Sequence, residues 1–292
     1  LSLAWGIAQL GWIAGPATLL LFSSITYYTS RLLSDCYRHH STGKRNYTYM
    51  EAACGIVQCV MLCGATIGYA ITASISMVAI RKSDCLHKRG HAASCKFSTN
   101  LYLVGMGVAE VVVSQIPNFH KLAWLSVLAA IMSFLYASIG LGLAVARVAS
   151  GTWGKGETSS SLTGVEANGM DKIWRMCTAI GDMAFACSYS AILIEIQSTP
   201  AENKVMKKAS GVAVSVSTVF YLLCGCFGYA AFGNRAPGNM LSASGFYEPF
   251  WLIDLANVCI VIHLVGAFQV NLAYFTRCLN RQVALQEKVI VI

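Results

Sequence analysis

Charged residues are scarce in this sequence of 292 residues, and their scarcity excludes most soluble folds. Lys and Arg number 21, Asp and Glu number 13, and together they make up 12% of the chain. In soluble domains about a quarter of the residues are charged. Apolar residues make up 56%, which is too many for a disordered chain. This composition is typical of a helical membrane protein.

Motifs of several enzyme and binding classes are also missing. The sequence contains no G-x-S-x-G, no H-E-x-x-H and no glycine-rich phosphate loop followed by Lys and Ser or Thr. The net charge of +8 is spread over short polar stretches, whereas nucleic-acid binding needs one basic patch. We therefore expect no enzyme activity, no metal, no cofactor and no nucleic-acid partner, and we expect the basic residues to contact the lipid bilayer.

Long apolar runs recur along the whole chain, and most approach the roughly 20 residues that cross a hydrocarbon core about 30 Å thick. We expect an all-α, polytopic transmembrane helical bundle with about eight membrane segments. Gly15-Pro16 is predicted to separate the first two, because this dipeptide ends helices. No charged leader precedes the first run, so the chain is expected to begin inside a membrane helix. The segments are 1–14, 17–33, 54–80, 101–116, 122–148, 173–196, 209–232 and 250–275.

A polar stretch after the third run holds two cysteines and two histidines. Cys85 and Cys95 can form a disulfide, which would place this loop in an oxidising compartment outside the cell. With His87 and His91 they can instead bind zinc, although the spacing matches no common structural zinc module. A third alternative is that they do neither. The cysteines inside apolar runs, Cys59 among them, are expected to be free packing residues.

The charges do not decide which way the segments cross the membrane. If the loops alternate from a cytoplasmic N-terminus, Arg31, Lys207 and Lys208 lie inside, and the loop with Cys85 lies outside. Lys and Arg are then almost equally divided between the two sides. The positive-inside rule therefore favours neither orientation by itself.

Four acidic residues and one histidine fall inside the apolar runs: Glu110, Asp182, Glu195, Asp254 and His263. Such groups are costly in hydrocarbon, so each is a candidate functional residue. Glu195 and Asp254 lie near predicted helix ends, where their side chains can reach interfacial water. His263 titrates near neutral pH and can carry a proton, or it can be a core histidine that is hydrogen-bonded to a helix carbonyl.

Asp182 differs from the others because small and polar residues surround it, over 181–190. Such a stretch can allow close packing of helices. It can also interrupt the helix and leave backbone amides and carbonyls free to bind a ligand, as in many transporters. We favour the interrupted helix, with an equivalent interruption in the first segment. On this interpretation a proton would be carried by Asp182 or His263.

Five blocks of the sequence occur, in the same order, in a known family of proteins. They are Leu1–Trp5 through Gly15-Pro16, Gly43–Met50, Ser114–Pro117, Ile192–Gln197 and Phe250–Asp254. With them the chain resembles the plant amino acid permeases of the amino acid/auxin permease family over most of 1–269. The resemblance implies a leucine-transporter-type fold of two inverted five-helix repeats. It also implies symport of protons with neutral and acidic amino acids, by alternating access, across the plasma membrane.

The resemblance also implies where the substrate binds. By position, the family's interrupted sixth helix falls on Ala184, Phe185, Ala186, Ser188 and Tyr189. Tyr69 on the third helix and Asn257 on the last would face the same cavity. His263 opens a His-Leu-Val-Gly block and would take part in proton coupling.

The sequence departs from the family pattern at both ends. It lacks the start of the first helix and the last three helices, and it diverges after Gln269. We therefore expect an incomplete, partial inverted-repeat transporter domain at 1–275 and a divergent polar tail at 276–292. The competing interpretation is a membrane protein that does not transport, either a partner of full-length permeases or an inert fragment. Helix surfaces left without neighbours would favour its association with other proteins.

Overall fold

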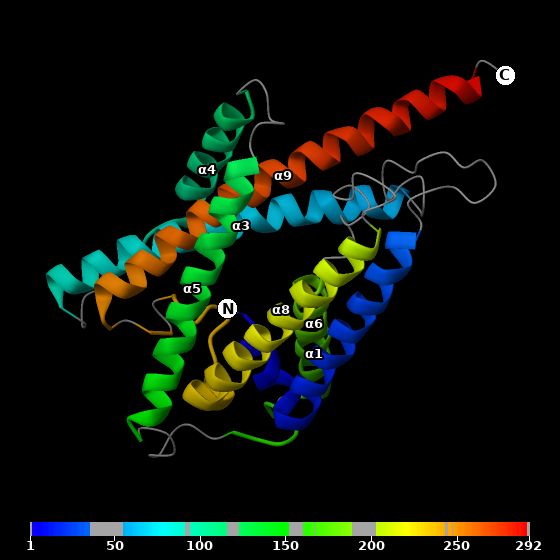
Figure 1. The fold of residues 1–292 in the computed structure, drawn as a ribbon. Coiled ribbons are helices and arrows are strands. Elements are labelled where there is room, and N and C mark those ends of the chain that lie inside the picture. The colour runs from blue at the N-terminus through cyan, green and yellow to red at the C-terminus, as the bar shows by residue number, and fades with distance from the viewer. Residues whose placement is uncertain are drawn as a thin grey trace. The chain divides into compact units, whose positions relative to one another are not determined.

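The fold is built from helices, in agreement with the sequence. The computed structural model describes residues 2–35, 55–90, 94–115, 123–151, 160–166, 168–188, 203–242, 245–246 and 248–290. Within these ranges lie seven α-helices and one 3₁₀-helix (Figure 1). They are α1 (Leu3–Asp35), α3 (Gly55–Arg89), α4 (Thr99–Ser114), α5 (Ala123–Ala149), α6 (Gly169–Ala186), α8 (Asn203–Phe232), η4 (Gly233–Arg235) and α9 (Phe250–Ile290).

Five of these helices, α1, α3, α5, α8 and α9, are long and apolar enough to cross a membrane, and α4 is a shorter apolar helix. Each of the eight predicted runs falls on one of the helices, and the first two share α1. The sixth run extends beyond α6, and its last residues, Tyr189 and Glu195 among them, lie outside the described part. Helix α9 continues to Ile290, through most of the predicted polar tail.

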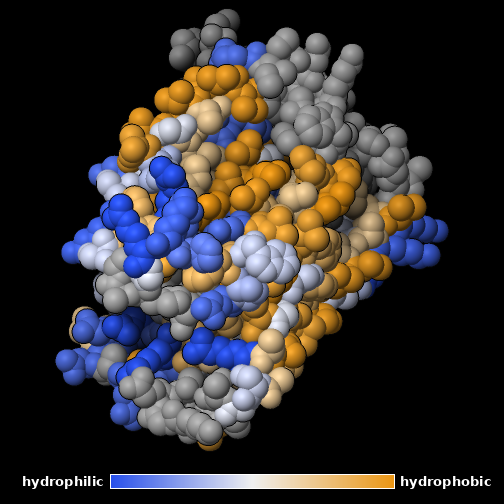
Figure 2. All heavy atoms as spheres, turned by 90° about the vertical axis from the view of Figure 1, so that its left-hand side faces the viewer, coloured by the Kyte–Doolittle hydropathy of each residue, from blue (hydrophilic) through white to orange (hydrophobic). Residues whose placement is uncertain are grey.

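Helix surfaces confirm a multi-pass membrane protein. On α4 the large apolar side chains of Leu101, Val104, Val108 and Val111 are between 60% and 74% exposed, and their spacing of three to four residues puts them on one helix face. In water such a face would be unfavourable, but in a bilayer it contacts acyl chains. Figure 2 shows hydrophobic residues over much of the drawn face, with hydrophilic residues gathered apart from them.

The chain divides into two compact units. The first contains Leu1–Cys54 and Leu141–Met240, and the second contains Gly55–Gly140 and Leu241–Ile292. In the first unit, α1 packs along α8 and against α6 (Figure 1). In the second unit, α3 packs along α9 and against α4. The boundary between the units falls within α5.

Helix α1 is interrupted at Gly11, so the predicted break at Gly15-Pro16 is wrong by about one turn. Gly11 has φ 85° and ψ 175°, a conformation that only glycine adopts without strain. Pro16 lies within the helix that starts again after the break. Pro16 is the fifth residue after Gly11, so it removes one intrahelical hydrogen bond, the one that a residue at this position would donate to the Trp12 carbonyl. The glycine therefore ends the first half of α1, and the proline does not.

Residues 160–166 lie beside this break and replace its missing backbone bonds. The Trp12 N–H donates to the Ser161 carbonyl at 3.4 Å, and the Val165 N–H donates to the Ala8 carbonyl at 3.1 Å. In a continuous helix the Trp12 N–H would bond to the Ala8 carbonyl instead. The fully buried Tyr229 on α8 accepts a hydrogen bond from the Ser161 N–H at 2.9 Å. This segment therefore satisfies the groups that the break frees.

A disulfide joins Cys85 at the end of α3 to Cys95, with the two Cα atoms 6.2 Å apart. The thiolates that zinc binding would require are therefore consumed in a covalent bond. His91 lies outside the described residues. Cys59 is also disulfide-bonded, so its interpretation as a free packing residue is wrong. The cysteines at 63, 177, 187, 226 and 259 are free thiols.

Candidate functional site

Helix α6 ends at Cys187, which has φ −95° and ψ 17°. The helix is regular from Gly169 to Ala186, so the small and polar residues that begin at Gly181 do not interrupt it at once. The reason is local, because alanine is the best helix former and both Ala184 and Ala186 fall in the last turn. The helix gives way to a turn at Cys187, and the rest of the predicted interruption, from Tyr189 on, lies outside the described residues.

Hydroxyl groups from α1 and α8 reach those carbonyls. The Thr26 hydroxyl donates to the Cys187 carbonyl, and the Tyr221 hydroxyl donates to the Ala186 carbonyl at 3.2 Å. The Ser23 Oγ lies 3.8 Å from the Cys187 Sγ. Thr26 and Ser23 are both buried. The end of α6 is therefore held by neutral side chains.

A cavity of about 70 Å³ adjoins this helix end. It has room for several water molecules or for the polar part of a small ligand. Its polar walls are hydroxyls of α1 and α8, and every described residue that lines it has a neutral side chain. Because the carboxyl end of a helix carries a partial negative charge, the cavity favours a positively charged group. The lining residues are Ser23, Thr26, Ala186, Cys187, Ala213, Val214, Ser217, Thr218 and Tyr221.

The other residues of the predicted site are distributed over both units. Ala184, Phe185 and Ala186 form the last turn of α6, with Phe185 half exposed, and Ser188 follows them. Asp182 is half-buried one turn before the end of the helix. Tyr69 on α3 and Asn257 on α9 belong to the second unit, whereas α6 belongs to the first.

Asn257 is fully buried, and its side chain stabilises the backbone of the second unit. Its Nδ2 donates to the Leu241 carbonyl at 2.9 Å and to the Ile253 carbonyl at 3.0 Å. These bonds tie the residues before α9 to its second turn. The amide therefore has a structural task besides the substrate contact that the family resemblance implies.

His263 is half-buried on α9 and hydrogen-bonds to a helix carbonyl. Its Nδ1 lies 2.8 Å from the carbonyl oxygen of Ala129 on α5, so Nδ1 must carry the proton that is donated. The imidazole also meets the edge of the Tyr136 ring, with the centroids 5.7 Å apart. Nε2 is then the nitrogen that can gain and lose a proton.

A buried pair of polar side chains on α4 and α9 has no counterpart in the predicted site. Glu110 is 2% exposed and Gln269 is 1% exposed. The Gln269 Nε2 donates to the Glu110 carbonyl at 2.9 Å and to its Oε2 at 2.5 Å. The sequence marks Glu110 as an acid inside an apolar run. It gives no sign that the glutamine 159 residues later is its partner, because only the fold brings the two together.

The family of transmembrane amino acid transporter proteins matches residues 1–289. The chain belongs to this family. Amino acid permease 6 of Arabidopsis thaliana is 57% identical over 289 residues, which cover 92% of this chain and 60% of that protein. Amino acid permease 8 of the same plant is 56% identical, with the same two coverages. Amino acid permease 3 is 50% identical over 306 residues, with 98% and 63% covered.

This member of the transmembrane amino acid transporter family therefore spans about 60% of the length of the relatives it matches. The family match continues to residue 289, past Gln269, where the resemblance read from the sequence stops. No solved structure matches the chain.

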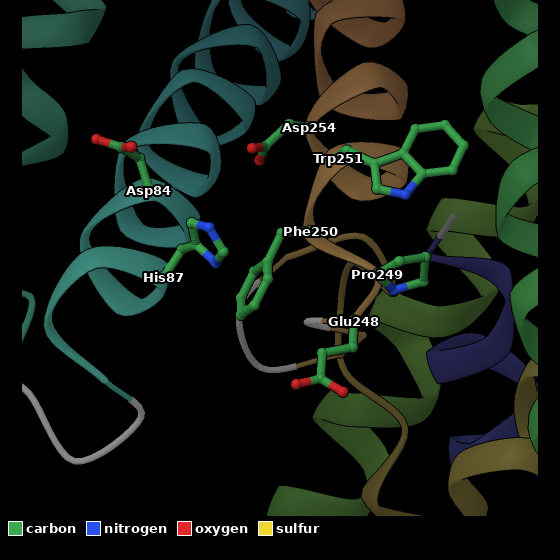
Figure 3. Close-up of a pocket in the computed structure, with 7 residues that line it drawn as sticks. All are labelled: Asp84, His87, Glu248, Pro249, Phe250, Trp251 and Asp254. Carbon is green, nitrogen blue, oxygen red and sulfur yellow. The ribbon is translucent and has the colours of Figure 1, made fainter.

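A hollow lined by acidic residues lies in the second unit, where α3 ends and α9 begins (Figure 3). It has a volume of about 720 Å³ and is lined by three carboxylates, those of Asp84, Glu248 and Asp254. His87 and Phe250 face each other across it, with ring centroids 4.9 Å apart. Lys88 already pairs with Asp84 at 2.8 Å. Within the described residues, no group of three or more His, Cys, Asp or Glu side chains is arranged to hold a metal ion.

Proposed function

We propose that this chain carries out proton-coupled import of neutral and acidic amino acids across the plasma membrane by alternating access. The observation that carries the proposal is the end of α6 at Cys187, where carbonyls adjoin a cavity whose described lining residues are polar or apolar but not charged. The names of the relatives, which are amino acid permeases, agree with it. Helix ends that meet small-molecule cavities inside a membrane protein are typical of secondary transporters.

The substrate's ammonium group would bind at the end of α6. The carbonyls of Ala186 and Cys187 each accept one side-chain hydroxyl, and a carbonyl oxygen has a second lone pair for another donor. The partial negative charge of the helix end would add attraction for a cation. Serine and threonine hydroxyls on α8 line the same cavity and can donate to a carboxylate. Binding would exchange these contacts and favour one access state over the other.

The first prediction concerns Thr26→Val, which keeps the side-chain shape and removes the hydroxyl that reaches Cys187. We expect uptake of radiolabelled amino acids by transport-deficient cells to fall about tenfold. Loss of one hydrogen bond costs about 1.4 kcal/mol, and this free energy corresponds to a tenfold change in an equilibrium constant. Thr29→Val is the matched control, since its hydroxyl donates to Ile25 on its own helix at 2.9 Å. Equal uptake by the Thr26 and Thr29 variants would contradict the proposed site.

Proton movement would supply the driving force. A membrane potential of about 100 mV contributes roughly 2.3 kcal/mol for each charge moved, which sustains about a fiftyfold gradient of a neutral solute. His263 is proposed to carry the proton on Nε2, since Nδ1 is held by Ala129. Asp182, half-buried on α6, is the second proposed carrier and lies one turn from the proposed substrate site.

The second prediction is that His263→Gln uncouples uptake from protons. A glutamine amide can still donate to the Ala129 carbonyl, but it cannot titrate between acidic and neutral pH. We expect the variant to take up substrate, but at about the same rate in acidic and in neutral external medium. His87→Gln, which replaces an exposed histidine, is the control and should keep the stimulation by external acid. A His263 variant with undiminished acid stimulation would remove His263 from the mechanism.

The alternative is a membrane protein that associates with a full-length permease without transporting. Its specific support is the apolar surface of α4, where Val104 and Val108 are 65% and 60% exposed and can pack on another membrane helix. Co-purification of the chain with an intact permease, together with no uptake when it is expressed alone, would favour this alternative.

A further inference from the structure

A groove of about 920 Å³ runs between α1 and α8 in the first unit. On α1 it is lined by Leu20, Ser24, Tyr27 and Arg31. These positions are spaced by three or four residues and so form one stripe along the helix. The stripe is apolar at Leu20 and positively charged at Arg31. The groove therefore has one apolar end and one basic end.

Along α8 the lining side chains also change between basic and apolar, but here the basic residues come first in the sequence and the apolar residues follow. Lys208, Val212, Val219 and Leu222 line the groove from its basic end to its apolar end. The two helices are tied at the basic end by Lys207, whose Nζ lies 2.6 Å from the Asp35 Oδ1. Val212 is 65% exposed and Val219 is 55% exposed. Their apolar surface is thus available to a molecule lying in the groove.

The basic end of the groove has three positively charged side chains, and only one of them is paired with a described carboxylate. Lys207 is paired with Asp35. Arg31 lies over the Tyr27 ring, 5.7 Å from its centroid, and Lys208 is exposed. Among the described residues no carboxylate pairs with Arg31 or Lys208. Two cations at the mouth of an apolar groove are complementary to a ligand with an anionic head and a hydrocarbon tail.

The length of the groove agrees with such a ligand. Leu20 and Arg31 are eleven positions apart on a helix that rises 1.5 Å per residue, so they are separated by about 16 Å along the axis. A hydrocarbon core about 30 Å thick has leaflets of about 15 Å each. The groove thus extends from a headgroup level, marked by Arg31 and Tyr27, to about the middle of the bilayer.

We propose that this groove binds an anionic phospholipid. Arg31 and Lys208 hold the phosphate, and an acyl chain lies along Leu20, Val212 and Val219. The disulfide at the end of α3 favours the orientation with the Cys85 loop outside the cell. The same orientation puts these basic residues on the inner side, where anionic lipids are abundant. Ser23, Val214 and Thr218 line both this groove and the cavity at the end of α6. Lipid binding would not require that the chain transport anything.

The test is native mass spectrometry of the purified chain in detergent, titrated with phosphatidylglycerol or phosphatidylcholine of identical acyl chains. We expect phosphatidylglycerol to bind at least tenfold more tightly. Arg31→Gln with Lys208→Gln should weaken phosphatidylglycerol binding about thirtyfold and phosphatidylcholine binding by about threefold or less, because the choline cation of the second lipid offsets the charge of its phosphate. Ser215→Trp, which fills the groove beside Val212 and keeps both charges, should weaken both lipids.

The matched control removes the same charge elsewhere in the first unit. Lys172→Gln with Arg175→Gln changes two basic residues of α6 that do not line the groove. It should leave phosphatidylglycerol binding within about twofold of the unchanged chain. Equal weakening by both double variants would show a general charge effect and overturn the proposal. Equal affinity for the two lipids, or a dimer of the chain that excludes lipid and is broken by Ser215→Trp, would overturn it too.

Discussion

Replacing Gly11 with alanine is expected to destabilise the chain strongly, although it adds only one methyl group. Gly11 has φ +85°, and a Cβ at this position would collide with the backbone of Leu162 and Gly164. The positive φ alone costs about 1–3 kcal/mol for other residues. With the collision we expect a loss of at least about 3 kcal/mol, or a fall of about 6–12 °C in the melting temperature in detergent.

Gly142→Ala on α5 is the control for this experiment. A Cβ at Gly142 would meet nothing within 4 Å, and alanine is a better helix former than glycine. Its melting temperature should be unchanged or slightly higher. A Gly11 variant as stable as the Gly142 variant would show that α1 runs through residue 11 as an ordinary helix.

Replacing Gln269 with leucine is expected to leave the Glu110 carboxyl buried without its donor. Both side chains are almost fully buried, and Gln269 Nε2 supplies the bond to Glu110 Oε2. Loss of one partner of a buried polar pair costs about 3 kcal/mol when the other can be ionised. The measurement is the melting temperature of the variant in detergent, followed by size-exclusion chromatography.

A double variant separates this explanation from loss of packing. Glu110→Leu combined with Gln269→Leu removes both polar groups, so it should recover most of the stability that the single change loses. Gln115→Leu, at an exposed position just after α4, should have little effect. If the double variant is less stable than Gln269→Leu, the pair is not the source of the loss.

The membrane character of the fold could be predicted from the sequence because it depends on the run lengths alone. Each apolar run found from composition falls wholly or partly on a helix. The boundary inside α1 could not be placed as well. Pro16 is a strong helix breaker in isolation, but it follows a positive-φ glycine closely enough that few intrahelical hydrogen bonds are lost. Which of Gly11 and Gly15 takes the unusual conformation depends on residues 160–166, which are far away in sequence.

The candidate site could be predicted only in part, for a similar reason. Small and polar residues near Asp182 indicate a departure from the helix, and α6 does end within that stretch, at Cys187. The partners of that end, Thr26 and Tyr221, carry no such signal. Threonine and tyrosine are ordinary residues inside membrane helices, and only the packing of α1 and α8 against α6 selects these two. For Tyr69 the predicted role remains a prediction.

The hydrogen bond between the Val165 N–H and the Ala8 carbonyl also affects the order in which parts of the chain fold during synthesis. The peptide groups exposed where α1 bends have their protein partners about 150 residues further along the chain. At a translation rate of about 5–20 residues per second, those partners emerge about 10–30 s later. Until then water or the insertion machinery must solvate the bend, so α1 reaches its final form only after residues 160–166 have been made.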